Sequence, residues 1–267
     1  MSMETAVATA FALGRTLVLP PEQNIYLLAN DHRKDNNRFT FRDFFHFDSI
    51  ETEHDSVEVI SMEEFLKREA LTGNLRNKVT GAVSFPPQNR TAWDGHIRKS
   101  RDFYNWLRNS TASPIWSFSK CVVAIPATPG KDAAAEAFDL HKRMKPNQMA
   151  RYIDNPTPVD APPLDRLNEM LAARKELCLY GDIMQNQKVI HFMGDNASGA
   201  RLLVHFYAFL FFYDYRQDLF VKRFVRDHLR YIDEIQCTAA RVVAAMRQKA
   251  REHGDPDGNF DTFHIRR

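Results

Sequence analysis

The feature that most constrains the fold is a helix-forming stretch that leads at once into a short apolar run near the amino terminus. Residues 3–13 are rich in alanine and other helix formers, and Gly14 is suited to the left-handed residue that ends a helix. Residues 16–19, Thr-Leu-Val-Leu, then predict a buried strand, which Pro20-Pro21 closes. A helix joined by a short connection to a buried strand is half of a βαβ unit. The sequence therefore predicts an α/β fold.

Apolar runs alternate with helical segments further along the chain. Ser61, followed three residues later by Glu64, fits a capping box and predicts a helix over 62–70. The prolines within 154–163 predict a linker. By the same criteria, strands are predicted at 57–60, 120–126 and 188–193, helices at 131–143 and 164–174, and loops at 31–37 and 72–98.

Residues 199–253 contain almost no helix breaker, so they predict one or two long helices. Residues 202–212 are apolar on every side, which is typical of a helix buried in a core. This apolar run is too short for the roughly 20 residues that cross a bilayer. The stretch that follows has apolar residues at helical spacing and predicts an amphipathic helix that stops at Gly254.

The composition predicts a globular chain without a general affinity for polyanions. The sequence has 36 Lys and Arg against 34 Asp and Glu, so no strongly basic field would attract nucleic acid. Hydrophobic residues make up 44% of the 267 residues, and 20 residues are Phe, which predicts an aromatic core.

The three cysteines, Cys121, Cys178 and Cys237, show neither a metal-ligand spacing nor a CxxC pair. Cys121 opens an apolar run and Cys237 lies in a helical stretch, so we expect buried free thiols. One disulfide with one thiol left over is the alternative.

The carboxyl-terminal residues carry the clearest candidate chemistry. A dense turn signal over 254–259 precedes the alternating residues 260–267, which predict a strand. On such a strand His264 and Arg266 project from one face, and Arg267 projects from the other. A histidine and a guanidinium at the carboxyl end of a strand can hold a phosphate. The alternatives are a solvated basic terminus for Arg266 and a core or surface histidine for His264.

The sequence His-Ile-Arg-Arg at 264–267 resembles the H-x-R-R stretch of GDP-fucose protein O-fucosyltransferases. Residues 4–21 resemble the first helix and second strand of that family, and the likeness is also strong over 188–253 but weak between about 30 and 185. In the family a Gly-Asp or similar pair follows H-x-R-R, and a Gly-rich, Asn-containing loop precedes the helix. No pair follows Arg267 and no such loop precedes the first helix in this sequence. We therefore expect it to be part of a longer protein and to be inactive by itself.

The resemblance implies a GT-B-like α/β fold, with a Rossmann-like domain over 1–196 and the beginning of a nucleotide-sugar-binding domain over 197–267. It implies transfer of L-fucose from GDP-fucose to a hydroxyl of a protein Ser or Thr or of a glycan, with inversion. Arg266 would be catalytic and contact the β-phosphate, since a fixed guanidinium stabilises the charge that develops on the diphosphate. His264 would bind the nucleotide or phosphate. Neither a metal ion nor another cofactor is expected.

The family works in the lumen of the endoplasmic reticulum or Golgi, and the resemblance implies the same compartment. Sequons at Asn89, Asn109 and Asn196 agree with that compartment, although no signal-peptide pattern opens the sequence. Two other function classes stay open. One is a non-catalytic relative that binds a carbohydrate or a protein, and the other is an unrelated nucleotide-binding α/β protein that shares H-x-R-R by chance. The sequence names neither the acceptor nor the general base.

Overall fold

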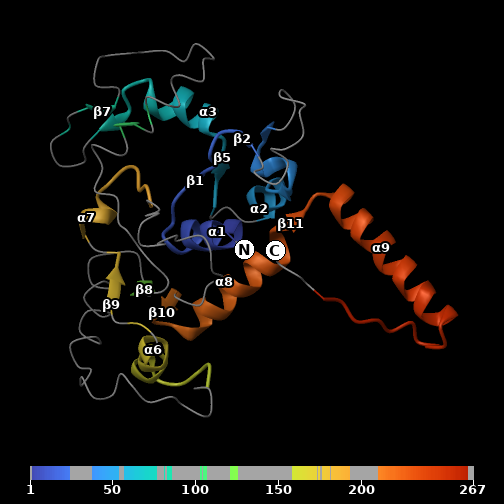
Figure 1. The fold of residues 1–267 in the computed structure, drawn as a ribbon. Coiled ribbons are helices and arrows are strands. Elements are labelled where there is room, and N and C mark those ends of the chain that lie inside the picture. The colour runs from blue at the N-terminus through green and yellow to red at the C-terminus, as the bar shows by residue number, and fades with distance from the viewer. Residues whose placement is uncertain are drawn as a thin grey trace. The chain divides into compact units, whose positions relative to one another are not determined.

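A computed structural model describes two compact units of the chain. The first unit comprises Met1–Pro21 and Asp48–His228, and the second comprises Glu22–Phe47 and Leu229–Arg267. Helices and strands occur in both, so the predicted α/β class is confirmed at this level (Figure 1). The predicted domain boundary at 196 lies outside the described residues and stays a prediction. The described residues are 2–24, 38–53, 57–76, 81, 83–85, 103, 105–106, 121–125, 158–172, 174, 176–180, 182–192 and 210–263.

A parallel three-stranded sheet in the order β10-β8-β9 forms the centre of the first unit. Its strands are β8 (Cys121–Ile125), β9 (Glu176–Leu179) and β10 (Leu210–Phe212). In the register, Val123 of the central strand pairs with Leu210 on one side and with Cys178 on the other. The central strand is a continuous apolar run because a parallel strand inside a sheet is buried on both faces.

Helix α6 (Pro163–Ala172) lies between β8 and β9 in the sequence and covers one face of this sheet. Its Leu167 and Leu171 are buried in one core cluster with Val122, Ala124 and Phe211 of the strands. Val122 and Ala124 are two positions apart, so both project toward the same helix.

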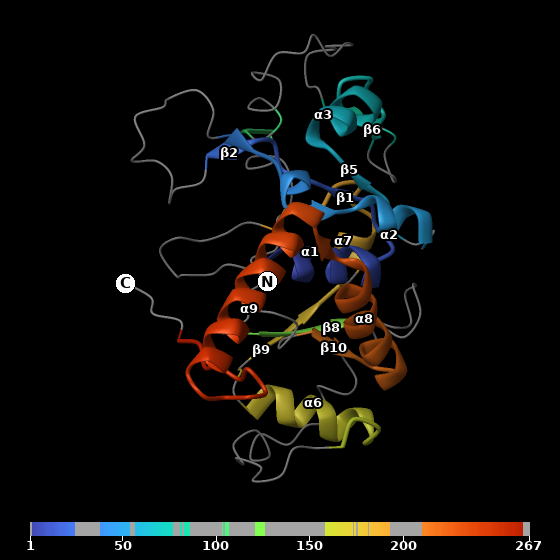
Figure 2. The same cartoon turned by 90° about the vertical axis from the view of Figure 1, so that its right-hand side faces the viewer.

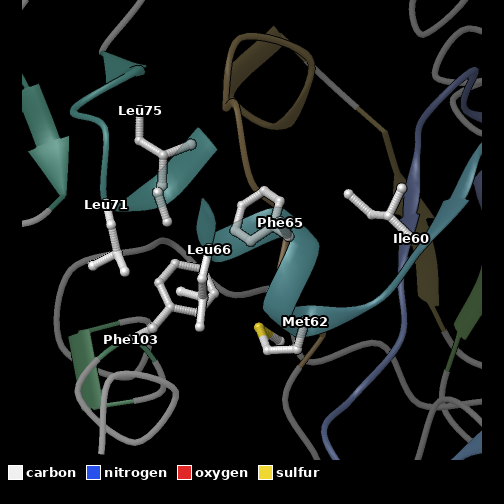
Figure 3. Close-up of a cluster of buried hydrophobic side chains, with 8 residues drawn as sticks. Ile60, Met62, Phe65, Leu66, Leu71, Leu75 and Phe103 are labelled. Atoms are coloured by element: carbon white, nitrogen blue, oxygen red, sulfur yellow. The ribbon is translucent and has the colours of Figure 1, made fainter. Parts of the chain in front are cut away.

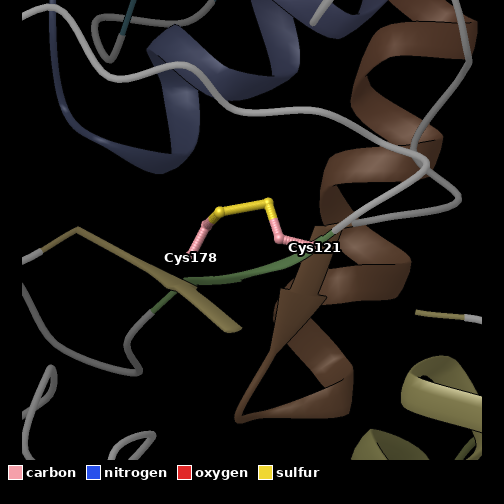
Figure 4. Close-up of a disulfide and its surroundings, with 2 residues drawn as sticks. All are labelled: Cys121 and Cys178. Carbon is pink, nitrogen blue, oxygen red and sulfur yellow. A yellow bond between two sulfur atoms is a disulfide. The ribbon is translucent and has the colours of Figure 1, made fainter. Parts of the chain in front are cut away.

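The opposite face of the sheet carries a disulfide. Cys121 and Cys178 link β8 to β9, with Cα atoms 5.7 Å apart (Figure 4). Helix α8 (Tyr215–His228) packs beside β10, and α1 (Ser2–Ala12) packs on α8. In that contact the rings of Phe11 and Phe224 stack, with their centroids 4.7 Å apart. In both views α6 lies on one side of the sheet and α1 lies on the other, while α8 runs alongside β10 (Figures 1 and 2).

A second parallel pair in the first unit joins β1 (Leu17–Val18) to β5 (Val59–Ile60). Ser61 then caps α3 (Met62–Phe65), since its hydroxyl accepts a hydrogen bond from the Glu64 amide at 3.1 Å. The helix continues as the π-helical turn η3 (Leu66–Ala70). The apolar side chains of this segment form a core cluster (Figure 3), whose members are Ile60, Met62, Phe65, Leu66, Ala70, Leu71, Leu75 and Phe103. Shorter elements of the unit are α2 (Asp48–Glu53), β6 (Leu75–Arg76), β7 (Val83–Phe85) and α7 (Asp182–Gln185).

The second unit is built from two antiparallel strand pairs and one long helix. The pairs are β2 (Gln23–Asn24) with β3 (Arg38–Phe39), and β4 (Phe45–His46) with β11 (Arg230–Tyr231), and the short helix η2 (Phe41–Asp43) lies between β3 and β4. Helix α9 (Asp233–Glu252) follows β11 and has no buried residue. It ends as predicted, because Gly254 adopts the left-handed conformation at a φ of 100°.

Several sequence predictions are confirmed. Helix α1, strand β1, strand β8 and helix α6 lie where local patterns predict them, and Gly14 has a φ of 60°. The Ser61 arm of the predicted capping box is present. The predicted helix at 131–143, the loop at 31–37 and the three sequons lie outside the described residues.

Other predictions are wrong. Residues 210–212, expected inside a buried helix, form the buried strand β10, while 202–209 lie outside the described residues. An apolar run without periodicity fits either element, and here burial on both faces of a parallel sheet decides it. Residues 188–192 form no strand, and the predicted loop at 72–98 contains β6 and β7. The long helices expected over 199–253 are α8 and α9, with β11 between them.

The prediction of buried free thiols is also wrong. Cys121 and Cys178 are bonded, because neighbouring parallel strands bring them together across 57 residues of sequence. Cys237 is the free thiol that the alternative left over, and it is exposed.

Candidate functional site

The residues that the sequence singles out, His264, Arg266 and Arg267, lie outside the described residues. The turn that leads to them is present: the Asp255 carboxylate accepts hydrogen bonds from the amides of Asp257 and Gly258 at 2.9 and 3.1 Å. The predicted strand over 260–267 is wrong over its described half, since residues 260–263 form no strand. The shared face of His264 and Arg266 therefore stays a prediction.

The carboxyl ends of the parallel strands are the other candidate position, because open α/β sheets bind ligands there. Strand β9 ends at Leu179 and leads to Tyr180, and β10 ends at Phe212 and leads to Tyr213 and Asp214. Both ends belong to the first unit. We call these two strand ends, with the residues that hold them, the carboxyl edge.

Arg15 holds the β9 side of the carboxyl edge. Its Nε donates to the Tyr180 hydroxyl at 2.8 Å, and its Nη1 donates to the Gln187 carbonyl at 2.8 Å. Its Nη2 donates to the carbonyls of Met184 and Gln185, the last two residues of α7, at 2.9 and 3.2 Å. The last carbonyls of a helix lack partners within the helix, so a cation there both caps α7 and opposes its dipole.

Arg166 of α6 holds the β10 side in a similar way. Its guanidinium donates to the carbonyls of Phe212 and Tyr213, at 3.1 and 2.6 Å, and to Ala161 at 3.1 Å. It also lies over the ring of Phe211, 5.3 Å from the centroid. Burial lowers the pKa of Arg166 below its ordinary value, and the nearby carboxylates of Asp218 and Asp214 act in the opposite direction.

An ion pair lies just past the end of β10. The Arg216 guanidinium donates to both carboxylate oxygens of Asp214, and the Arg216 amide donates to the same carboxylate at 2.9 Å. These bonds hold the pKa of Asp214 below its ordinary value. The carbonyl of Asp214 also accepts the first helical hydrogen bonds of α8, so this residue caps the helix. The Arg216 side chain is 77% exposed.

The carboxyl edge thus combines two arginines that bind mainly backbone carbonyls with one exposed arginine next to a carboxylate. Sequence reasoning missed both structural arginines, because their acceptors are carbonyl groups, which carry no residue-type signature. The position of Arg15 directly after the glycine that ends α1 is the one sequence signal that marks it. Within the part of the chain that the structure describes, no group of three or more His, Cys, Asp or Glu residues could hold a metal ion, and no helix is long and apolar enough to cross a membrane.

Comparison with known proteins gives a family but no individual relative. The family model described as GDP-fucose protein O-fucosyltransferase matches residues 1–267. No curated protein and no solved structure shows significant similarity to the chain. Because the family match extends over the whole sequence, including the Arg15 connection and the His-Ile-Arg-Arg stretch, this chain belongs to the GDP-fucose protein O-fucosyltransferase family.

Proposed function

We propose that the protein transfers L-fucose from GDP-fucose to a hydroxyl group of a protein Ser or Thr or of a glycan, with inversion at the anomeric carbon. The observation that carries this proposal is the family match over all 267 residues. The family is one of fucosyltransferases, and its description names GDP-fucose as the donor.

Arg266 is the residue proposed to drive the reaction. Cleavage of the bond between fucose and the β-phosphate leaves negative charge on the departing GDP. A guanidinium that donates two parallel hydrogen bonds to that phosphate stabilises the transition state more than the ground state. His264, two residues earlier, is proposed to bind the nucleotide or phosphate. We propose that this charge stabilisation needs no bound metal.

Inversion follows from direct displacement. The acceptor oxygen attacks the anomeric carbon on the face opposite the leaving phosphate, so one bond forms as the other breaks. The acceptor hydroxyl gives its proton to a general base, and the GDP leaves with the bonding electrons.

The proposed architecture is of the GT-B type, with a Rossmann-like domain over 1–196 and the beginning of the nucleotide-sugar-binding domain over 197–267. The parallel order β10-β8-β9, with helices on both faces, supports a doubly wound arrangement in the first unit. The boundary itself rests on the family resemblance.

Members of this family act in the secretory pathway, and we propose the lumen of the endoplasmic reticulum or Golgi for this protein. The Cys121–Cys178 disulfide supports an oxidising compartment, since such bonds persist there and are rare in the cytosol.

A variant series in the full-length protein tests the proposed role of Arg266. Removal of one preorganised donor to a developing charge typically costs about 10²–10³ in rate, so Arg266→Ala should reduce turnover by at least that factor. Arg266→Lys should restore little, because a point charge does not reproduce the bidentate fork.

Arg267→Ala is the matched control, because it removes the neighbouring guanidinium on the other predicted face. It should leave turnover of the folded protein nearly unchanged, with thermal melts confirming that each variant folds. Near-normal turnover of Arg266→Ala, or a greater loss in Arg267→Ala, would show that the active face is assigned wrongly.

A further inference from the structure

Arg15, which is partly buried, directs its whole guanidinium at one segment of the first unit. A guanidinium has five N–H groups, and all five of those of Arg15 are directed at acceptors within Tyr180 and residues 182–188. Four of these contacts are described above, and the fifth runs from Nη1 to the Lys188 carbonyl at 3.5 Å. Every acceptor is a neutral carbonyl or hydroxyl oxygen.

These contacts join parts of the first unit that lie far apart in the sequence. Arg15 is separated by 165 to 173 residues from its acceptors. It directly follows the left-handed Gly14, so the end of α1 fixes where its side chain starts. The segment it holds begins at Tyr180, at the carboxyl end of β9, and therefore forms part of the carboxyl edge.

The held segment has little regular secondary structure of its own. Helix α7 has only four residues, which is too short to be stable by propensity. Two further side-chain hydrogen bonds hold the segment. Within it, the Gln185 side chain donates to the Tyr180 carbonyl at 2.8 Å, and outside it, the Lys188 ammonium donates to the Asn74 carbonyl at 2.8 Å. Among the described residues, Arg15 donates five of the side-chain hydrogen bonds that this segment makes.

We propose that Arg15 is a positioning residue for the transfer reaction: it holds Tyr180 and residues 182–188 rigid as one wall of the substrate site at the carboxyl edge. This inference rests on the proposed function. A site needs its walls preorganised, since a displacement of about 1 Å can cost on the order of 10² in rate. Arg15 itself touches no substrate, because its donors are all in use.

The inference predicts a local effect that differs from general destabilisation. In Arg15→Ala, backbone amides of residues 184–188 should exchange with deuterium at least tenfold faster, while those of β8 keep their protection. Global unfolding would instead expose both regions together. Faster exchange in both regions, or in neither, would overturn the inference.

Kinetics of the full-length protein then separate positioning from stability. At saturating GDP-fucose and acceptor, kcat per folded molecule should fall at least tenfold in Arg15→Ala. Arg15→Lys should recover only part, because an ammonium has three N–H groups rather than a planar fork. Tyr180→Phe removes one of the five acceptors and should change kcat less than threefold.

Arg68→Ala is the control, since Arg68 is an exposed arginine that pairs with Glu58. It should leave kcat unchanged. If wild type transfers no fucose, the proposed function and this inference fail together. If wild type is active but Arg15→Ala keeps wild-type kcat, only the inference fails.

Discussion

The disulfide between β8 and β9 gives the prediction that the structure makes most quantitatively. Cys121 and Cys178 are 57 residues apart. Without their bond, the loop between them is unconstrained in the unfolded state, so the conformational entropy of the unfolded chain rises. In the chain-entropy account, a loop of this length corresponds to about 4 kcal/mol at room temperature. For a chain of this size, each kcal/mol corresponds to roughly 2–4 °C in Tm, so the expected fall is roughly 8–16 °C.

The disulfide is removed in two ways, by reduction and by mutation, because the two methods differ in what they leave at the site. Reduction of the wild-type protein keeps both sulfur atoms in place. The double variant Cys121→Ala/Cys178→Ala removes them and leaves the buried position of Cys121 apolar, which avoids an unpaired hydroxyl. Thermal melts followed by circular dichroism should show a similar fall in both cases.

Cys237→Ala is the control for the general effect of removing a thiol. Cys237 is exposed and unbonded, so its replacement should leave Tm unchanged with or without reductant. Peptide mapping of the non-reduced protein should recover the peptides that contain residues 121 and 178 as one linked species. The reasoning would be refuted if reduction left the wild-type Tm unchanged, or if the linked species contained Cys237.

Three further predictions concern single contacts. Leu167→Ala, in the fully buried contact between α6 and the sheet, should cost about 2–5 kcal/mol in urea unfolding. Ser61→Ala should lower the free energy of unfolding by roughly 0.5–2 kcal/mol, seen as a lower urea midpoint at an unchanged slope, because it removes the cap of α3. Because Arg216 lowers the pKa of Asp214, that pair stabilises the fold above the unfolded-state pKa of Asp214, and the contribution is lost as pH falls through the folded pKa. Arg216→Ala should raise the pKa of Asp214, as measured by NMR titration of the carboxylate.

The parts of the fold that follow from local chemistry could be predicted from the sequence. The helix before Gly14, the strand after it and the stop at Gly254 depend largely on the conformations that nearby residues prefer, and here tertiary packing agrees with those preferences. The Ser61 cap is equally local, since its acceptor and donor are three residues apart.

The misassigned parts depend on tertiary context. The apolar run that ends in β10 has no helical or strand periodicity, so only its place beside β8 makes residues 210–212 a strand. The disulfide depends on which strands are neighbours, a matter that cysteine spacing does not reveal.

The candidate site shows the same division. His264 and Arg266 were found from a short motif and its family resemblance, and the structure does not describe them. Arg15 and Arg166 were found only in the structure, because a guanidinium that binds carbonyl groups leaves no pattern in the residue types around it. Sequence motifs therefore mark the residues proposed to touch the donor, whereas the residues that hold the scaffold are visible only in the folded structure.

The central claim is tested most directly by NMR of the product formed when the purified full-length protein is incubated with GDP-fucose and a panel of protein and glycan acceptors. The account predicts acceptor-dependent release of GDP and a fucosylated product whose anomeric configuration is opposite to that of the donor. Retention of configuration would contradict the inverting mechanism. If the protein transfers fucose to none of the acceptors, the proposed function itself is contradicted, even if the protein binds GDP-fucose.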